Sequence, residues 1–243
     1  MVRPLIFWLL ASIAFAAPKA DPTGWNLYPR YGRRLCHMAT SLKKQLFFRA
    51  KTSEKRVALT FDDGPLRRTP ALLKLLRSRH VPATFFLLAP QLNTPRAHRY
   101  EGTLFSVGLH GYHHVDFRKL TPAQVRRELD RALKIFHRYG LHPRYFRPPY
   151  GMVSATLLQY LAQHQLRTIL WSIDSQDWNH YHGTRLIENI RKSLAPGSII
   201  LLHDQATSLA DVAALIDAIQ TSGYRIVPLG DLVTRGTLLP CPK

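Results

Sequence analysis

Two adjacent carboxylates, Asp62 and Asp63, stand directly after a short apolar and β-branched run. Adjacent Asp residues can simply turn the chain, and Asp63 followed by Gly64 and Pro65 fits that interpretation. Two carboxylates at one strand end also repel each other, and the repulsion is relieved if one of them binds a cation. The other would then stay free to accept a proton. The pair therefore predicts either a turn or a metal site beside a general base.

Two histidines could complete such a cation site. His110 and His114 are four positions apart, which places them on one face of a helical turn. Because the chain has 12 histidines, this spacing alone carries a real risk of coincidence. With one Asp from another strand end, the two imidazoles form a ligand set that leaves positions for water and substrate. His113 points elsewhere on such a turn and is assigned to the surface or to a supporting role.

Arg147 and His203 have chemistry suited to the same place. Arg147 precedes Pro148 and Pro149, which hold an extended segment, so its guanidinium could clamp a carboxylate in a bidentate pair. The alternative is an exposed arginine in an ordinary loop. His203 follows the apolar run 199–202. A histidine there more often packs in the core, but beside a metal it could donate a proton.

These residues can act together only if the fold brings them to one place. From residue 55 onward, β-branched or aromatic runs alternate with helical patterns, which predicts an α/β fold with a parallel sheet. The alternation fits a (β/α) barrel, complete or incomplete, or an open doubly wound sheet. The expected strands are 57–61, 83–88, 104–108, 144–146, 168–173, 198–202 and 225–227, and the expected helices are 70–79, 122–139, 155–164, 185–194 and 209–221.

Two of the helices carry start and stop signals. Thr121 followed by Gln124 predicts a capping box, and Gly140 ends that helix. Ser208 predicts the start of another helix, which Gly223 ends.

Active sites of both architectures lie where the carboxyl ends of the parallel strands meet. Five of the seven expected strands end in clusters of ionisable residues. Without an active site, such groups would scatter over helix faces and loops. Their convergence is the strongest indication of a catalytic site in this sequence. The clusters are residues 60–65, 110–114, 147–151, 174–178 and 203–204.

The chain of 243 residues, 46% of them hydrophobic, fits one globular domain. Residues 1–16 combine Arg3, an apolar run shorter than a membrane span and small residues, which predicts a cleaved signal peptide. An uncleaved N-terminal anchor is the alternative. We expect a secreted or periplasmic protein without a transmembrane helix. Its parts would be an N-terminal extension over 17–54 wrapped on the domain, a catalytic domain over 55–235 and a tail over 236–243.

The formal charge of +19 favours polyanionic partners. Because we expect the chain to be exported, the favoured polyanionic partners are cell-envelope polymers such as peptidoglycan, or phospholipid head groups. Nucleic acid is excluded as a partner because the sequence has no interleaved aromatic and basic recognition motif. In an oxidising compartment Cys36 and Cys241 could form a disulfide, a hypothesis that fails if both thiols react under denaturing, non-reducing conditions.

In this order, the five clusters resemble the polysaccharide deacetylase family, also called the NodB-homology family or carbohydrate esterase family 4. Residues 60–65 (TFDDGP) and 147–151 (RPPYG) are highly specific for it, 201–204 (LLHD) less so, and 81–86 are similar to its second strand. The resemblance extends from about Arg56 to Asp231. It implies a distorted (β/α)7 barrel of the NodB-homology type.

The resemblance implies a role for each matching residue. Asp63, His110 and His114 would hold a divalent metal, zinc first, with Co2+, Ni2+ or Mn2+ as alternatives. Asp62 would be the general base for hydrolysis of an acetamido group, which yields acetate and a free amino sugar. Arg147 would orient Asp62, and Asp177 would tune the general acid His203. The backbone N–H of Tyr150 would stabilise an oxyanion, and Trp178 and Leu201 would line the substrate pocket.

The sequence departs from the family pattern beside the histidines. The family usually has Ser or Thr after the first histidine, where its hydroxyl braces the loop, and this chain has Gly111. Pro commonly follows the second, and this chain has Val115. We therefore expect a looser loop and weaker metal binding, with the chemistry intact.

The favoured activity is N-deacetylation of peptidoglycan or a chitin-like glycan containing N-acetylglucosamine. The alternatives are an O-acetyl esterase acting on acetylated polysaccharide and a non-catalytic glycan-binding protein on the same scaffold. The last should have lost Asp62 or His203, and both are present.

Overall fold

The structure is a computed structural model that describes residues 46–235. The expected signal peptide, residues 17–45 of the extension, the tail over 236–243, Cys36 and Cys241 lie outside the described residues. Over residues 46–235, no helix has both the length and the apolar character needed to cross a membrane.

The described part of the chain forms a single nine-stranded sheet in which all pairings between the strands are parallel. The strands are β1 (Leu46–Phe47), β2 (Arg56–Gly64), β3 (Ala83–Leu87), β4 (Phe105–Leu109), β5 (Tyr145–Phe146), β6 (Arg167–Ile169), β7 (Ile173–Asp174), β8 (Ile199–His203) and β9 (Arg225–Ile226). Their order is β1-β6-β5-β4-β3-β2-β8-β7, with β9 beside β2. All seven expected strand regions lie in this sheet.

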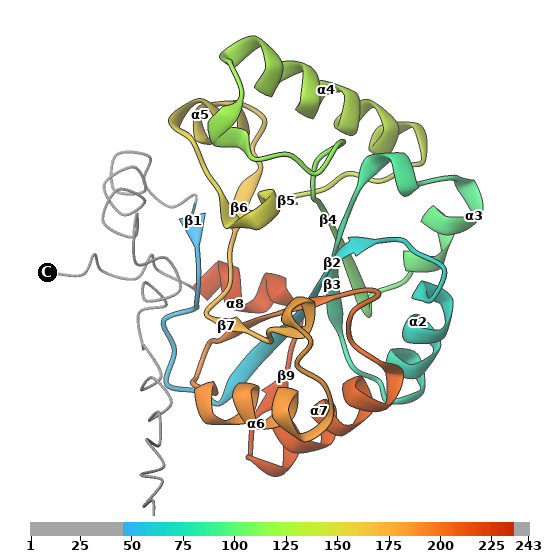
Figure 1. The fold of residues 1–243 in the computed structure, drawn as a ribbon, viewed down its shortest axis with the longest axis vertical. Coiled ribbons are helices and arrows are strands. Elements are labelled where there is room, and N and C mark those ends of the chain that lie inside the picture. The colour runs from blue at the N-terminus through green and yellow to red at the C-terminus, as the bar shows by residue number, and fades with distance from the viewer. Residues whose placement is uncertain (1–45, 236–243) are drawn as a thin grey trace, which may run out of the picture.

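Strands β6 and β7 bring the two ends of the sheet together. β6 pairs with β5 near one end of the order, and β7 pairs with β8 at the other. Only residues 170–172 separate the two strands in the chain, so the sheet curls round on itself (Figure 1). The prediction of one continuous strand over 168–173 was wrong, because the segment leaves one neighbour before it joins the other. The fold is the expected (β/α) barrel, distorted at this point.

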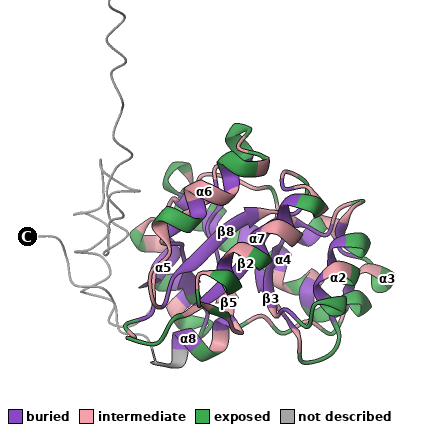
Figure 2. Cartoon of the chain, turned by 90° about the horizontal axis from the view of Figure 1, so that it is seen from below, coloured by how far each residue is buried: buried purple, intermediate pink, exposed green. Residues whose placement is uncertain are grey.

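The barrel is filled by large apolar side chains. Phe61 and Phe85 stack with ring centroids 5.3 Å apart, and all five residues of β3 are buried. Strands covered on both faces read as continuous apolar runs, which is why they are visible in the sequence. Figure 2 shows the buried residues concentrated in the strands and the exposed ones on the outer helix faces.

Helices pack around the barrel (Figure 1). The five expected helices are present, and each begins and ends within two residues of its predicted bounds. Two further helices, α3 and α8, were not predicted. The helices are α2 (Thr69–Ser78), α3 (Thr94–Ala97), α4 (Pro122–Arg138), α5 (Ala155–Gln163), α6 (Gly183–Ser193), α7 (Leu209–Thr221) and α8 (Leu229–Arg235).

The end signals of two helices are confirmed. Thr121 and Gln124 form the capping box of α4: each side chain accepts a hydrogen bond from the backbone N–H of the other. Ser208 caps α7 in the same manner by accepting the N–H of Asp211. Gly140 and Gly223, just beyond the two helices, have φ of 72° and 80°, the left-handed conformation that ends a helix.

The described end of the N-terminal extension belongs to the same core. Leu46 and Phe47 form β1 beside β6, and Phe48 and Ala50 are buried. The Ala50 N–H donates to the carbonyl of Gly197 at 2.9 Å. The sequence indicated no strand here, because the run is too short to show a periodic pattern.

Candidate active site

Asp62 and Asp63 lie beside the same imidazole, although successive side chains of a regular strand point to opposite faces. His110 Nε2 is 3.8 Å from Asp62 Oδ2 and 3.5 Å from Asp63 Oδ1. The register of β2 against β3 shifts between Asp62 and Gly64, and Asp63 has a φ of 71°. This bulge with a left-handed residue redirects the second carboxylate to the side of the first.

Asp63, His110 and His114 form a three-residue set that could hold a metal ion. Asp63 Oδ1 is 3.5 Å from Nε2 of His110 and 3.4 Å from Nε2 of His114. The three ligand atoms all lie within 4.8 Å of one another. Asp63 Oδ1 is buried, and no hydrogen-bond donor reaches it from residues 46–235. A buried carboxylate oxygen facing two imidazole nitrogens fits a divalent cation.

Neighbouring groups orient both histidines. His110 Nδ1 is 2.8 Å from the carbonyl oxygen of Arg147, which can only accept, so Nδ1 carries the proton and Nε2 presents its lone pair. Burial lowers the pKa of His110 to about 3, which keeps the imidazole neutral, as a metal ligand must be. His114 Nδ1 lies 3.2 Å from the Tyr150 hydroxyl, and the two rings meet edge to face.

Arg147 holds Asp62 in place from inside the barrel. Its side chain is fully buried, and its Nη1 donates to Asp62 Oδ1 at 2.7 Å and to Thr60 Oγ1 at 2.8 Å. The guanidinium lies over the Phe86 ring, 4.2 Å from the centroid. Burial raises the pKa of Asp62, and the charge of Arg147 opposes that shift without cancelling it. Asp62 is therefore a fixed carboxylate whose basicity is greater than that of an ordinary aspartate.

The other guanidinium nitrogens of Arg147 bind the backbone where the barrel is distorted. Nε donates to the carbonyl of Ile169 at 3.2 Å, and Nη2 donates to that of Leu170 at 3.1 Å. These residues stand where the chain leaves β6, so a side chain takes the place of a neighbouring strand. These contacts exclude the alternative interpretation in which Arg147 is an exposed arginine in an ordinary loop.

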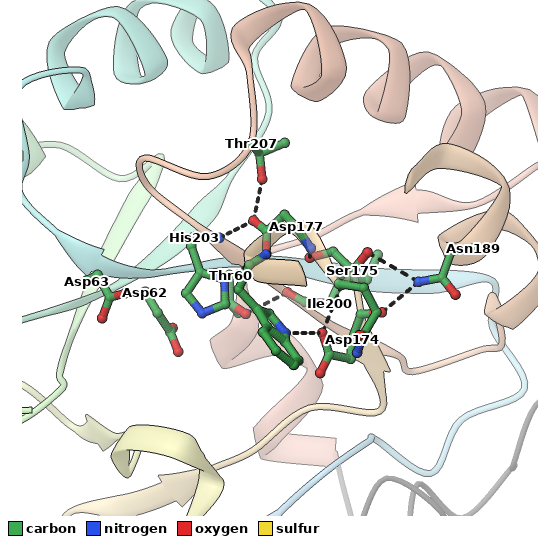
Figure 3. A network of polar contacts seen from close by, with 12 residues as sticks. Thr60, Asp62, Asp63, Asp174, Ser175, Asp177, Asn189, Ile200, His203 and Thr207 are labelled. Carbon is green, nitrogen blue, oxygen red and sulfur yellow. Dashed lines mark hydrogen bonds and ion pairs between the residues drawn. The ribbon is translucent and has the colours of Figure 1, made fainter. Parts of the chain in front are cut away.

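His203 is the residue opposite Asp62 in the pairing of β2 with β8. The His203 ring Nδ1 lies 2.7 Å from Asp177 Oδ1, and the His203 backbone N–H donates to Asp177 Oδ2 at 2.7 Å. The Thr207 hydroxyl donates to the same Oδ2 (Figure 3). Burial alone would lower the pKa of His203, but the hydrogen bond and charge of Asp177 prevail and raise it to about 9. His203 is thus protonated at neutral pH and can donate a proton.

Two exposed aromatic side chains stand on loops of the site. Tyr150 is 58% exposed and Trp178 is 55% exposed. Trp178 lies in the turn η6 (Asp177–Asn179), and its Nε1 donates to Asp174 Oδ1 at 3.1 Å. A cavity of about 510 Å³ lies beside Tyr150 and His114. Leu201 is buried in β8, in register with Asp174.

The fold gathers the seven residues assigned to metal binding and catalysis, and it adds supporting residues that were not predicted. Thr60 supports Arg147, Thr207 supports Asp177, and Asp174 supports Trp178. Glu128 of α4 contacts the loop between His110 and His114. Its signal was present in the sequence, because a charged residue interrupts the otherwise apolar buried stripe of a helix.

Comparisons with known proteins identify the family of this chain. Residues 49–169 match the family model described as "Polysaccharide deacetylase". A peptidoglycan-N-acetylglucosamine deacetylase of Listeria monocytogenes is 30% identical over 201 residues, which cover 81% of this chain and 42% of the relative. This chain therefore spans less than half the length of that relative. A chitooligosaccharide deacetylase of Bradyrhizobium is 33% identical over 199 residues, covering 73% of this chain and 90% of the relative.

The solved structure of a CE4 family pseudoenzyme from Bacillus anthracis superposes with a TM-score of 0.73. The alignment has 24% identity and covers 80% of this chain and 70% of that one. At this identity the likeness shows a shared fold alone.

Proposed function

This chain belongs to the polysaccharide deacetylase family, and we propose that it uses a divalent cation to remove acetyl groups from glycans containing N-acetylglucosamine. One observation carries the proposal: three candidate cation ligands, a buried carboxylate and a histidine whose pKa is raised to about 9 occupy one rim of the barrel. Metal-assisted hydrolysis of an amide uses each of these three parts.

Asp63, His110 and His114 would hold the cation, which we propose to be zinc, with Co2+, Ni2+ or Mn2+ as alternatives. Two imidazoles and one carboxylate are a common ligand set of catalytic zinc. A bound divalent cation lowers the pKa of a water molecule and polarises a carbonyl group.

Asp62 accepts the proton of the attacking water. Its Oδ1 is taken by Arg147, so Oδ2, on the side of His110, is the oxygen that receives the proton. Because burial raises its pKa, Asp62 is a better base than an exposed aspartate at the same pH.

His203 donates its proton to the amide nitrogen as the carbon–nitrogen bond breaks, since the nitrogen would otherwise have to leave as an anion, which is a poor leaving group. Asp177 keeps His203 charged. It binds the Nδ1 of the His203 ring, so the other ring nitrogen, Nε2, faces away from the Asp177 carboxylate. The backbone N–H of Tyr150 is proposed to stabilise the oxyanion. Trp178 would pack against the sugar, and Leu201 would contact the acetyl methyl group.

We propose peptidoglycan as the first substrate class, with chitin-like polymers second. Support comes from the named activities of the relatives and from the formal charge of +19, which favours an anionic polymer. A secreted or periplasmic location is part of the proposal. N-terminal sequencing of the mature protein would test it, with cleavage after residue 16 as the expected result.

The test of the activity is acetate release from purified peptidoglycan and from chitooligosaccharides, before chelation, after chelation and after zinc is added back. We expect release that chelation abolishes and zinc restores. O-acetylated polysaccharides serve as the comparison set for the esterase alternative. The proposal fails if only esters are hydrolysed and chelation has no effect.

A non-catalytic glycan-binding role is the less favoured alternative. A protein that had lost catalysis on this scaffold should lack one of the proton-transfer groups. In this chain, however, Asp62 is paired with Arg147 and His203 with Asp177, so both proton-transfer groups are present and held.

A further inference from the structure

The loop between His110 and His114 is held by a residue far away in the sequence. Gly111 has a φ of 100°, a left-handed conformation that glycine adopts without strain. It brings no hydroxyl to the loop. The expectation that the loop is therefore loose does not match the contacts, because Glu128 of α4 lies against it.

Glu128 binds the loop through both carboxylate oxygens. Oε1 accepts the backbone N–H of Tyr112 at 3.0 Å and that of His113 at 2.5 Å. Oε2 lies 2.7 Å from His113 Nδ1. Hydrogen bonds to an ionised acceptor are about twice as strong as neutral ones. The carboxylate therefore fixes the two successive peptide units 111–112 and 112–113, in the middle of the loop between His110 and His114.

The helix that carries Glu128 gives it a rigid base. Glu128 is only 6% exposed, and its neighbours Val125 and Leu129 on the buried face of α4 are fully buried. A charged group at such a position is costly to bury unless it is hydrogen-bonded, and the loop supplies the donors. Loop and helix therefore stabilise each other's positions.

The geometry points to Glu128 as a positioning residue: we infer that it fixes the 110–114 loop so that His110 and His114 present their nitrogens together to a divalent cation. The inference rests on the cation site of the proposed function but not on the identity of the substrate. Glu128 Oε1 would lie 3.8 Å from a Cβ added at Gly111, so the carboxylate binds the loop on the side where a serine or threonine side chain would stand. Groups that orient metal ligands typically affect metal affinity by 10- to 100-fold.

The test measures zinc affinity and loop protection in the whole protein, without substrate. Zinc dissociation constants come from competition with a chromophoric chelator, and amide hydrogen exchange is followed at Tyr112 and His113. Glu128→Ala should weaken zinc binding at least about 10-fold and speed exchange at both amides. Glu128→Gln keeps an oxygen acceptor and should stay within about 3-fold of the unaltered protein. The control Glu188→Ala removes a carboxylate from the outer face of α6 and should change neither.

Unchanged zinc affinity in Glu128→Ala would overturn the inference, as would an equal loss in the Ala and Gln variants. If the alanine variant does not fold, Glu128→Asp takes its place, because it keeps the charge but is one methylene too short to reach the loop. A loss of at least about 5-fold is expected for it, and no loss would overturn the inference. Failure of the deacetylase proposal looks different: zinc would bind tightly, with the same variant pattern, but no acetate would be released.

Discussion

The site has two sides that are held in different ways. On the metal side, formed by the candidate ligands Asp63, His110 and His114, both Asp63 and His114 have left-handed backbone conformations. Asp63 stands at the bulge near the end of β2, and His114 stands in the loop after β4. On the proton side, His203 ends the regular strand β8. Left-handed conformations cost non-glycine residues about 1–3 kcal/mol each, so they persist only where surrounding contacts impose them.

The contacts of the two sides differ accordingly. His203 and Asp177 satisfy each other with two hydrogen bonds, and Thr207 adds a third. Asp63 Oδ1 has no donor among the described residues and faces two imidazoles. The proton side is thus complete in its own hydrogen bonds, whereas the metal side depends on the groups that hold its loops. Variants should therefore separate proton transfer from cation binding.

The largest difference between the effect on proton transfer and the effect on cation binding is expected for Asp62→Asn. The amide keeps the shape of the side chain but cannot accept the proton of the attacking water, so kcat/KM should fall about 1,000-fold. Zinc affinity should change little, because the proposed ligands are Asp63 and the two histidines. Acetate release and zinc competition measure the two effects. A variant with turnover within tenfold of the unaltered enzyme would refute Asp62 as the base.

Arg147→Met should act on both sides by destabilising the barrel. It leaves Asp62 buried without its partner and removes the donors to the carbonyls of Ile169 and Leu170. Breaking a buried ion pair in this way costs about 3–5 kcal/mol in the free energy of unfolding. Urea denaturation measures the loss. Arg191→Met, which breaks an exposed pair on α6, is the control and should have little effect. Equal urea midpoints for the two variants would contradict the role of Arg147.

Asp177→Asn should change the proton side alone. In the unaltered protein His203 keeps its proton up to a pKa of about 9, so acetate release should decline as the pH rises through that value. Loss of the Asp177 charge lowers the pKa of His203, and the decline should move to lower pH. At pH 8 the rate should fall at least about 10-fold, because an ordinary imidazole has a pKa near 6.5. Rates measured between pH 5 and 10 give the profile.

The same pair makes stability depend on pH. The pKa of His203 is raised above its unfolded value, so its contribution is fully present below about pH 6.5 and is lost as the pH rises through about 9. The free energy of unfolding should fall over this window less in Asp177→Asn than in the unaltered protein. Asp217→Asn, at an exposed ion pair of α7, is the control. Identical pH profiles of all three proteins would rule out the assigned coupling.

The smallest effect is expected for Tyr150→Phe, on the metal side. The ring stays against His114, but the hydroxyl that lies 3.2 Å from His114 Nδ1 is lost. One hydrogen bond contributes about 1 kcal/mol, so its loss should raise the zinc dissociation constant roughly 5-fold. The alkaline limb of the pH profile should not move, since His203 is untouched. A shifted limb with unchanged zinc affinity would reverse the assignment.

Much of the fold was readable because it depends on local patterns. The helix 209–221 was predicted with its exact bounds, since Ser208 and Gly223 mark both ends. The segment 168–173 was misread, because its apolar run does not show that the strand changes partners midway. Glu128 was overlooked because the hydrogen bonds that explain it join α4 to a loop 15 and 16 positions away.

The sequence by itself predicted which residues meet at the candidate site, apart from supporting residues such as Thr60, Thr207 and Glu128. Apolar runs specify parallel strands, and the polar residues that follow those runs must then meet at one end of the barrel. It did not determine how Asp62 and Asp63 divide their work; only the resemblance to a family suggested that. The tertiary structure decided where the two carboxylates lie: the bulge between β2 and β3 turns Asp63 toward the histidines, and Arg147 holds Asp62 inside the barrel. Both depend on contacts between distant segments, which neighbouring residues in the chain do not specify.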